Sequence, residues 1–108
     1  MLEPLRITFR NMDPSPALEA RIRDCAARLE DLGARITSCH VTVASNHRHQ
    51  QKGRIFQVRI DLTVPGAGIA ISREPELDHS HEDARVAIRD AFDAARRKLL
   101  DLAGRREG

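Results

Sequence analysis

The sequence has little of what several large classes of protein depend on. Among its 108 residues there is no Trp or Tyr, and there are three Phe and two Cys. Few aromatic rings argue against a base-stacking platform. Cys25 and Cys39 lie in apolar patterns, so they predict neither a disulfide framework nor a zinc cluster. No apolar run approaches the roughly 20 residues of a membrane span, and MLEPLRITFR has no signal-peptide core.

These absences bound what the chain can be. We expect one cytoplasmic globular domain over residues 1–108, because this length supports a single hydrophobic core. No cofactor is expected. Nucleophile elbow, phosphate-binding glycine loop and HExxH motif are all missing, so the chain is expected not to be an enzyme.

Acidic residues are missing from one long stretch. None occurs between Asp31 and Asp61, although the net charge of the chain is only +2. The stretch contains five basic residues and three histidines: Arg35, Arg48, Lys52, Arg54, Arg59, His40, His47 and His49. A local concentration of positive charge is typical of contact with RNA phosphates.

Apolar periodicity predicts the first two elements. Leu5, Ile7 and Phe9 alternate with polar residues, which indicates a half-buried strand. Ser15 and the proline after it have the pattern of a helix start, and apolar residues then recur at helical spacing as far as Gly33, a candidate helix end.

Three more strands are predicted next. A second strand is expected from Ile36, a polar connection from Ser45 to Gly53, and a third strand from Arg54 to Val64. The turn sequence PGAG leads into a short fourth strand around Ile69 and Ile71.

The last element is a long amphipathic helix. Ser80 and Asp83 have the spacing of a capping box, the apolar stripe runs from Ala84 to Leu102, and Gly104 is the expected end. The prediction is therefore an α+β fold of order β-α-β-β-β-α, a four-stranded sheet with two helices packed on one face. The open face should carry Arg6, Arg10, His40, Arg59 and Asp61.

Two kinds of site compete. The pairs His47/His49 and His79/His81 suggest a metal-binding or protein-interaction role, although their spacing favours solvated loops and no metal site is predicted. The last helix places Arg85, Arg89 and Arg96 near one another, with Arg97 and Lys98 beside them. These cations fit either RNA contact or a solvent face on which Asp93 pairs with Arg96 or Arg97.

The strand RIFQVRIDLTVPG and the helix HEDARVAIRDAFDAARRKLLDLAGR resemble the ribosome hibernation-promoting factors, also called the ribosome-associated inhibitor or sigma-54 modulation protein family. The resemblance covers roughly Leu5 to Arg106. Ala87, Ile88 and Asp93 match the helix pattern of that family, whereas Arg89 replaces its first Asp.

The resemblance implies a protein that binds the 30S subunit and the 70S ribosome through 16S rRNA, where messenger and transfer RNA would sit, and so silences or preserves idle ribosomes. It assigns rRNA contacts to Arg89, Arg97 and Lys98 and, on the first helix, to Arg28. Together with the charge pattern, the predicted RNA-binding set is Arg28, Arg48, Lys52, Arg54, Arg59, Arg85, Arg89, Arg96, Arg97 and Lys98.

The chain departs from the family at its end. LLDLAGRREG replaces the lysine-rich tail, which removes phosphate contacts. The second domain with which long members pair ribosomes is also absent from this sequence, so self-mediated ribosome dimerisation is not expected. An exposed edge strand would still permit a homodimer of the chain itself.

Overall fold

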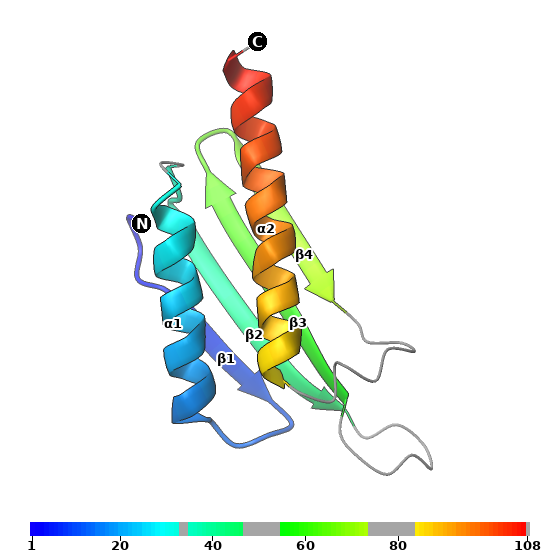
Figure 1. Ribbon diagram of the computed structural model, residues 1–108. Coiled ribbons are helices and arrows are strands. Elements are labelled where there is room, and N and C mark those ends of the chain that lie inside the picture. Colours follow the sequence, from blue (N-terminus) through cyan, green and yellow to red (C-terminus); the bar gives the residue numbers. More distant parts are fainter. Residues whose placement is uncertain (33–34, 47–54, 74–83, 108) are drawn as a thin grey trace.

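The computed structural model describes residues 1–32, 35–46, 55–73 and 84–107. The predicted α+β fold and its order β-α-β-β-β-α are confirmed, with both helices on one face of a four-stranded sheet (Figure 1). The elements are β1 (Arg6–Arg10), α1 (Pro16–Glu30), β2 (Ser38–Asn46), β3 (Ile55–Val64), β4 (Ala67–Arg73) and α2 (Ala84–Glu107).

The strands lie side by side in chain order, β1-β2-β3-β4. β3 is antiparallel to both β2 and β4, while β1 is parallel to β2 because α1 crosses over between them. The register places Ile7, Val41 and Ile60 in one row across three strands. The β3–β4 turn contains Gly66 at φ 82°, a left-handed conformation that glycine adopts without a steric penalty.

The start of α1 follows the sequence prediction, whereas its end does not. The Ser15 hydroxyl accepts a hydrogen bond from the Leu18 N–H at 3.2 Å, and proline occupies the first turn. The helix ends at Glu30, with Asp31 as its cap: the Asp31 N–H still bonds the Ala27 carbonyl, but the Leu32 N–H bonds the Leu29 carbonyl in a tighter, three-residue turn. Gly33, the predicted end, lies outside the described residues.

The core lies between the helices and the sheet. Ile22 of α1, Ile88 of α2 and the strand residues Val41, Val58 and Ile60 are all fully buried. Each strand alternates, so its other side chains face away from the helices. Burying one sheet face under two amphipathic helices is what the predicted periodicities require.

Two element ends run beyond their predicted limits. α2 continues through Gly104 to Glu107 and projects past the sheet (Figure 1). A helical glycine costs about 1 kcal/mol relative to alanine, which is too little to end a long helix. β2 likewise extends through Ser45, which is 2% exposed and whose hydroxyl has no hydrogen-bond partner in the described part of the chain.

Neither helix, over the residues that are described, is long and apolar enough to cross a lipid bilayer.

Candidate nucleic-acid interface

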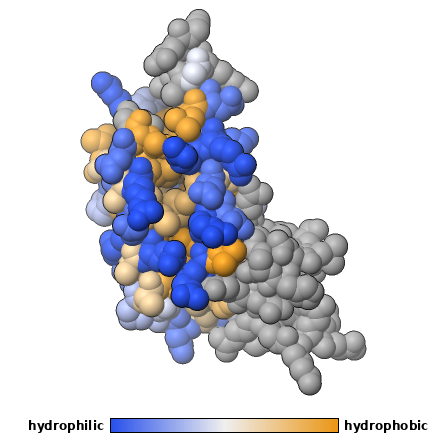
Figure 2. Space-filling model, in the orientation of Figure 1, coloured by the Kyte–Doolittle hydropathy of each residue, from blue (hydrophilic) through white to orange (hydrophobic). Residues whose placement is uncertain are grey.

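A groove separates α1 from α2 on the helical face of the molecule. Its volume is about 280 Å³. The groove is lined by three arginines, one aspartate and three less polar residues: Arg28, Arg89, Arg96, Asp93, Cys25, Leu29 and Phe92. Figure 2 views this face and shows hydrophilic residues along both helices, with hydrophobic ones between and beside them.

The arginines of the groove come from both helices, so the fold unites residues far apart in sequence. Arg28 pairs with Asp24 one turn earlier at 3.1 Å, and Arg89 contacts the neighbouring Asp90 at 3.6 Å. Both pairs are solvent-exposed and therefore weak. An anion of higher charge density can displace such partners, so these guanidinium groups are available to a phosphate.

The floor of the groove is less polar than its rim. Leu29 and Phe92 are nearly buried, and Cys25 is half-buried beside them. Burial raises the pKa of the Cys25 thiol above its ordinary value; the carboxylate of Asp24 adds to this, while Arg28 acts in the opposite direction. The thiol is thus protonated at neutral pH and serves as packing rather than as a nucleophile.

The other basic residues predicted on α2 lie apart from this groove. Arg97 and Lys98 line a second hollow with Asp101, on the side of α2 that faces Ile71 of β4. Arg85 is exposed in the first turn of α2 and already makes a contact within the chain. The predicted pairing of Asp93 with Arg96 or Arg97 is not among the ion pairs of the described residues, whereas Arg89 with Asp90 is.

Arg59 does not join the arginines of the helices. It lies on the open sheet face, where its guanidinium donates hydrogen bonds to both carboxylate oxygens of Asp61, the shortest at 3.0 Å. This contact raises the pKa of Arg59 and holds the side chain flat on the strand. Arg59 and Asp61 thus lie on the open sheet face, as the alternation of this strand predicts, and Arg59 faces away from the helices.

The remaining predicted positions lie outside the described residues. These are Arg48, Lys52 and Arg54, together with the histidine pairs His47/His49 and His79/His81 and the capping-box residues Ser80 and Asp83. Within the described ranges, no group of three or more His, Cys, Asp or Glu side chains is arranged to hold a metal ion.

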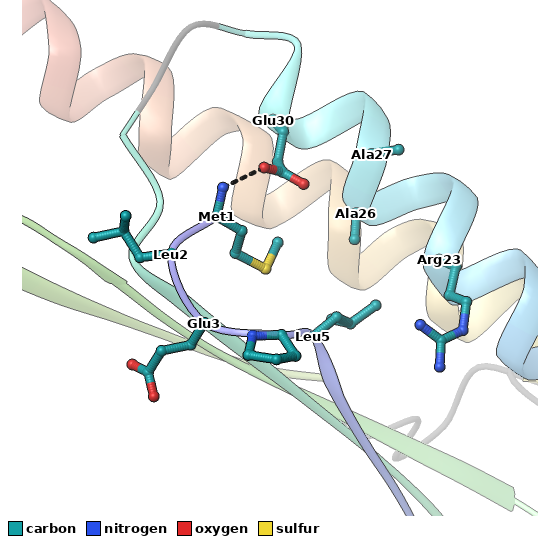
Figure 3. A pocket seen from close by; sticks show the side chains of 9 residues that line it. Met1, Leu2, Glu3, Leu5, Arg23, Ala26, Ala27 and Glu30 are labelled. Carbon is teal, nitrogen blue, oxygen red and sulfur yellow. Dashed lines mark hydrogen bonds and ion pairs between the residues drawn. The ribbon is translucent and has the colours of Figure 1, made fainter.

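A further hollow of about 460 Å³ lies where the N-terminal segment meets α1 (Figure 3). The amino group of Met1 donates to the Glu30 carboxylate at 2.5 Å across it. Arg23 and the Met1 amino group balance the charges of Glu3 and Glu30 around this hollow, so it lacks the excess of positive charge found in the groove between the helices.

The sequence pattern assigned Cys25, Leu29 and Phe92 to the core and did not identify them as the floor of a groove. Helical periodicity shows which side chains turn inward, but the spacing between two helices is set by tertiary packing. The sequence did contain one sign of a groove. Arginines lie three or four residues from Cys25 and Phe92, and this spacing places positive charge at the edge of each apolar stripe.

The two-layer α+β fold, with two helices on one face of a four-stranded sheet, is shared with known structures. A ribosomal subunit interface protein from Coxiella burnetii superimposes with a TM-score of 0.74 at 18% identity, covering 93% of this chain and 97% of that one. The N-terminal domain of Protein Y from Thermus thermophilus gives a TM-score of 0.65 at 17% identity, covering 87% and 91%. No curated protein matches the sequence.

The family described as Sigma 54 modulation protein / S30EA ribosomal protein matches residues 5–107. The chain belongs to this family of ribosome-associated proteins, which confirms the resemblance seen in its sequence.

Proposed function

We propose that the chain is a non-catalytic protein of the cytoplasm that binds the 30S subunit and the 70S ribosome, and so inhibits translation or protects idle ribosomes. The observation that carries this proposal is the groove between α1 and α2, where Arg28, Arg89 and Arg96 converge from two helices. Membership of the ribosome-associated family supports it independently.

The proposed contacts are with phosphates of 16S rRNA. Guanidinium groups suit phosphates because they are always charged and donate hydrogen bonds in a planar fork. Arg97 and Lys98 extend the basic surface over α2, while Arg85 and the loop residues Arg48, Lys52 and Arg54 are further candidate contacts. Arg59 is left out of the proposed interface, because Asp61 occupies its guanidinium on the opposite face.

The test is co-sedimentation with 30S, 50S and 70S particles over a series of salt concentrations. The variant Arg89→Gln/Arg96→Gln removes two charges from the groove. Its matched control, Arg6→Gln/Arg10→Gln, removes two from exposed positions of β1. If each groove arginine contacts one phosphate, the groove variant loses affinity and its salt slope falls by roughly two units.

The control is expected to bind 30S and 70S particles as the unaltered protein does. Equal losses in both variants would show that total charge alone governs binding, and the groove would lose its assigned role. Absence of saturable binding to 30S and 70S at low salt would contradict the proposed function itself.

The alternative role in metal binding or protein interaction depends on histidines outside the described residues, so no observation of the structure favours it. A homodimer would use one of the two edge strands, β1 or β4, and stays a prediction.

A further inference from the structure

The groove between α1 and α2 offers more than phosphate binding requires. Its rim carries the guanidinium groups of Arg28, Arg89 and Arg96, and its floor is formed by Leu29 and Phe92. A phosphate gains from the cations but gains nothing from an apolar floor. The combination suits a ligand that has an anionic part and a flat, weakly polar part next to it.

The size of the groove limits how large that flat part can be. Its volume of about 280 Å³ lies just below the range of about 300–1,000 Å³ that is usual for pockets holding whole small molecules. One nucleobase fits such a space. A stacked base pair within a duplex does not, because both bases would have to enter together.

Asp93 gives the groove a third kind of group. Its carboxylate lines the same space as the three arginines, where it would repel a phosphate. An ionised carboxylate accepts hydrogen bonds, and the exocyclic amino groups and ring N–H groups of bases donate them. The position of Asp93 therefore argues against a ligand that consists of phosphates alone. It favours a ligand that also has a base, whose N–H groups can donate hydrogen bonds to the carboxylate.

We propose that this groove receives one unstacked base of single-stranded RNA, while the flanking phosphates contact Arg28, Arg89 and Arg96. The inference rests on the proposed function and narrows it, since it selects single-stranded segments over the paired helices of the same RNA. Unpaired loops present bases that can leave the stack, which is how most sequence-dependent RNA contacts arise.

Cys25 is a built-in reporter for occupancy of the groove. It is half-buried among the groove residues, whereas Cys39 is 1% exposed and burial raises the pKa of its thiol to about 11. Iodoacetamide should therefore modify Cys25 first in the folded protein. Mass spectrometry of tryptic peptides then follows the rate of modification at each cysteine.

The experiment compares single-stranded hexaribonucleotides of mixed sequence with inorganic polyphosphate of equal charge and with a short RNA duplex. At a hexanucleotide concentration about ten times Kd, occupancy of the groove predicts roughly tenfold slower modification of Cys25. Polyphosphate and duplex, each at the same multiple of its own Kd, should slow it less than about twofold, because neither can place a base on the floor.

A variant provides a second, independent measurement. Cys25→Leu adds bulk to the floor without changing charge, and an unchanged thermal midpoint would show that the fold is intact. We expect roughly a tenfold weaker Kd for the hexanucleotide, measured by fluorescence anisotropy, which corresponds to about 1.4 kcal/mol. Affinity for polyphosphate should stay unchanged.

Two results would overturn base insertion. One is that polyphosphate or duplex protects Cys25 from modification as well as the hexanucleotide does, and the other is that Cys25→Leu binds the hexanucleotide with unaltered affinity. Either result leaves salt-dependent ribosome binding intact, so it does not touch the proposed function. Failure of the unaltered protein to sediment with 30S and 70S particles would instead remove the proposed function on which the inference rests.

Discussion

The two faces of the molecule both carry arginines, yet they differ in what those arginines are able to do. On the helical face Arg28, Arg89 and Arg96 surround a groove with a weakly polar floor. On the sheet face Arg59 lies along its strand, bonded to Asp61 through both carboxylate oxygens. The helical face is therefore concave and cationic, whereas charge on the sheet face is partly neutralised within the surface.

The difference shows that the number of basic residues is a poor guide to an anion site. A strand displays its side chains on a flat surface, where the neighbour two positions along, such as Asp61 for Arg59, is within reach. Two packed helices leave a valley between them, and residues on its two edges face one ligand from both sides. The shape of the surface therefore decides which basic side chains can contact the same anion.

The largest expected effect comes from weakening the packing of α2 against the sheet. Ile88 of α2 is fully buried against the sheet, so Ile88→Ala should lower the free energy of unfolding by about 3 kcal/mol. Urea denaturation followed by circular dichroism measures this. The matched control is Leu100→Ala on the same helix, which is 47% exposed and should change stability by less than about 0.5 kcal/mol. Similar losses for both would mean that α2 does not dock through the face that contains Ile88.

A buried thiol on the sheet side of the core should make the free energy of unfolding fall with rising pH in the alkaline range. Burial, reinforced by Asp61, raises the pKa of the Cys39 thiol from 9.0 to about 11. Between these two pH values the folded state keeps a proton on Cys39 that the unfolded state releases. The contribution of the thiol to the free energy of unfolding is therefore complete below pH 9.0 and is lost as the pH rises towards about 11. We expect a loss of about 2 kcal/mol over this range.

The measurement is urea denaturation at several pH values between 8 and 11, alongside Cys39→Val. This variant keeps an apolar side chain of similar size but has no thiol. It should lose less stability over the range than the unaltered protein. Parallel curves for the two proteins would show that Cys39 does not govern the alkaline transition.

A smaller effect is expected at the end of β2. Ser45 is buried, and its hydroxyl makes no hydrogen bond to any described residue. Ser45→Ala removes an uncompensated polar atom and should stabilise the fold by about 1 kcal/mol. Ser72→Ala, an exposed serine of β4, serves as the control and should be neutral or slightly destabilising. A loss of stability in Ser45→Ala would reveal a partner for this hydroxyl.

The smallest expected effect tests the difference between the faces directly. Arg59→Gln should change the affinity for 30S particles by less than about twofold, since Asp61 already satisfies this guanidinium. Arg89→Gln is the matched single change in the groove and should weaken binding clearly. A loss in Arg59→Gln equal to that in Arg89→Gln, measured by co-sedimentation, would extend the interface to the sheet face.

Most of the fold was predictable because periodicity determines it. Alternation identified the four strands, and the apolar stripes identified both helices. Boundaries were less accurate: Gly104 was expected to end α2, but the helix continues through it. A glycine ends a helix where the chain turns in a left-handed conformation, whereas α2 stays helical through Gly104, where no described atom outside the neighbouring residues and the helix backbone lies within 4 Å of the position of a Cβ.

The candidate site was predictable in part. Residue type and spacing identified Arg89 and Arg96 on one side of a helix, and the resemblance added Arg28. That these three converge on one groove depends on the packing of α1 against α2, which one sequence does not specify. Alternation correctly placed Arg59 on the open sheet face. The acid-free stretch does not show by itself which of its basic side chains share a surface, because a strand divides its side chains between two faces.

The strand order has a consequence for how the chain folds. Because each strand neighbours the next one along the chain, β2, β3 and β4 can form in succession through two antiparallel connections. β1 can join only after α1 has brought the chain back alongside β2, which requires a longer loop to close. We therefore expect the three-stranded meander to form early in the folding transition state, and β1 with α1 to dock last.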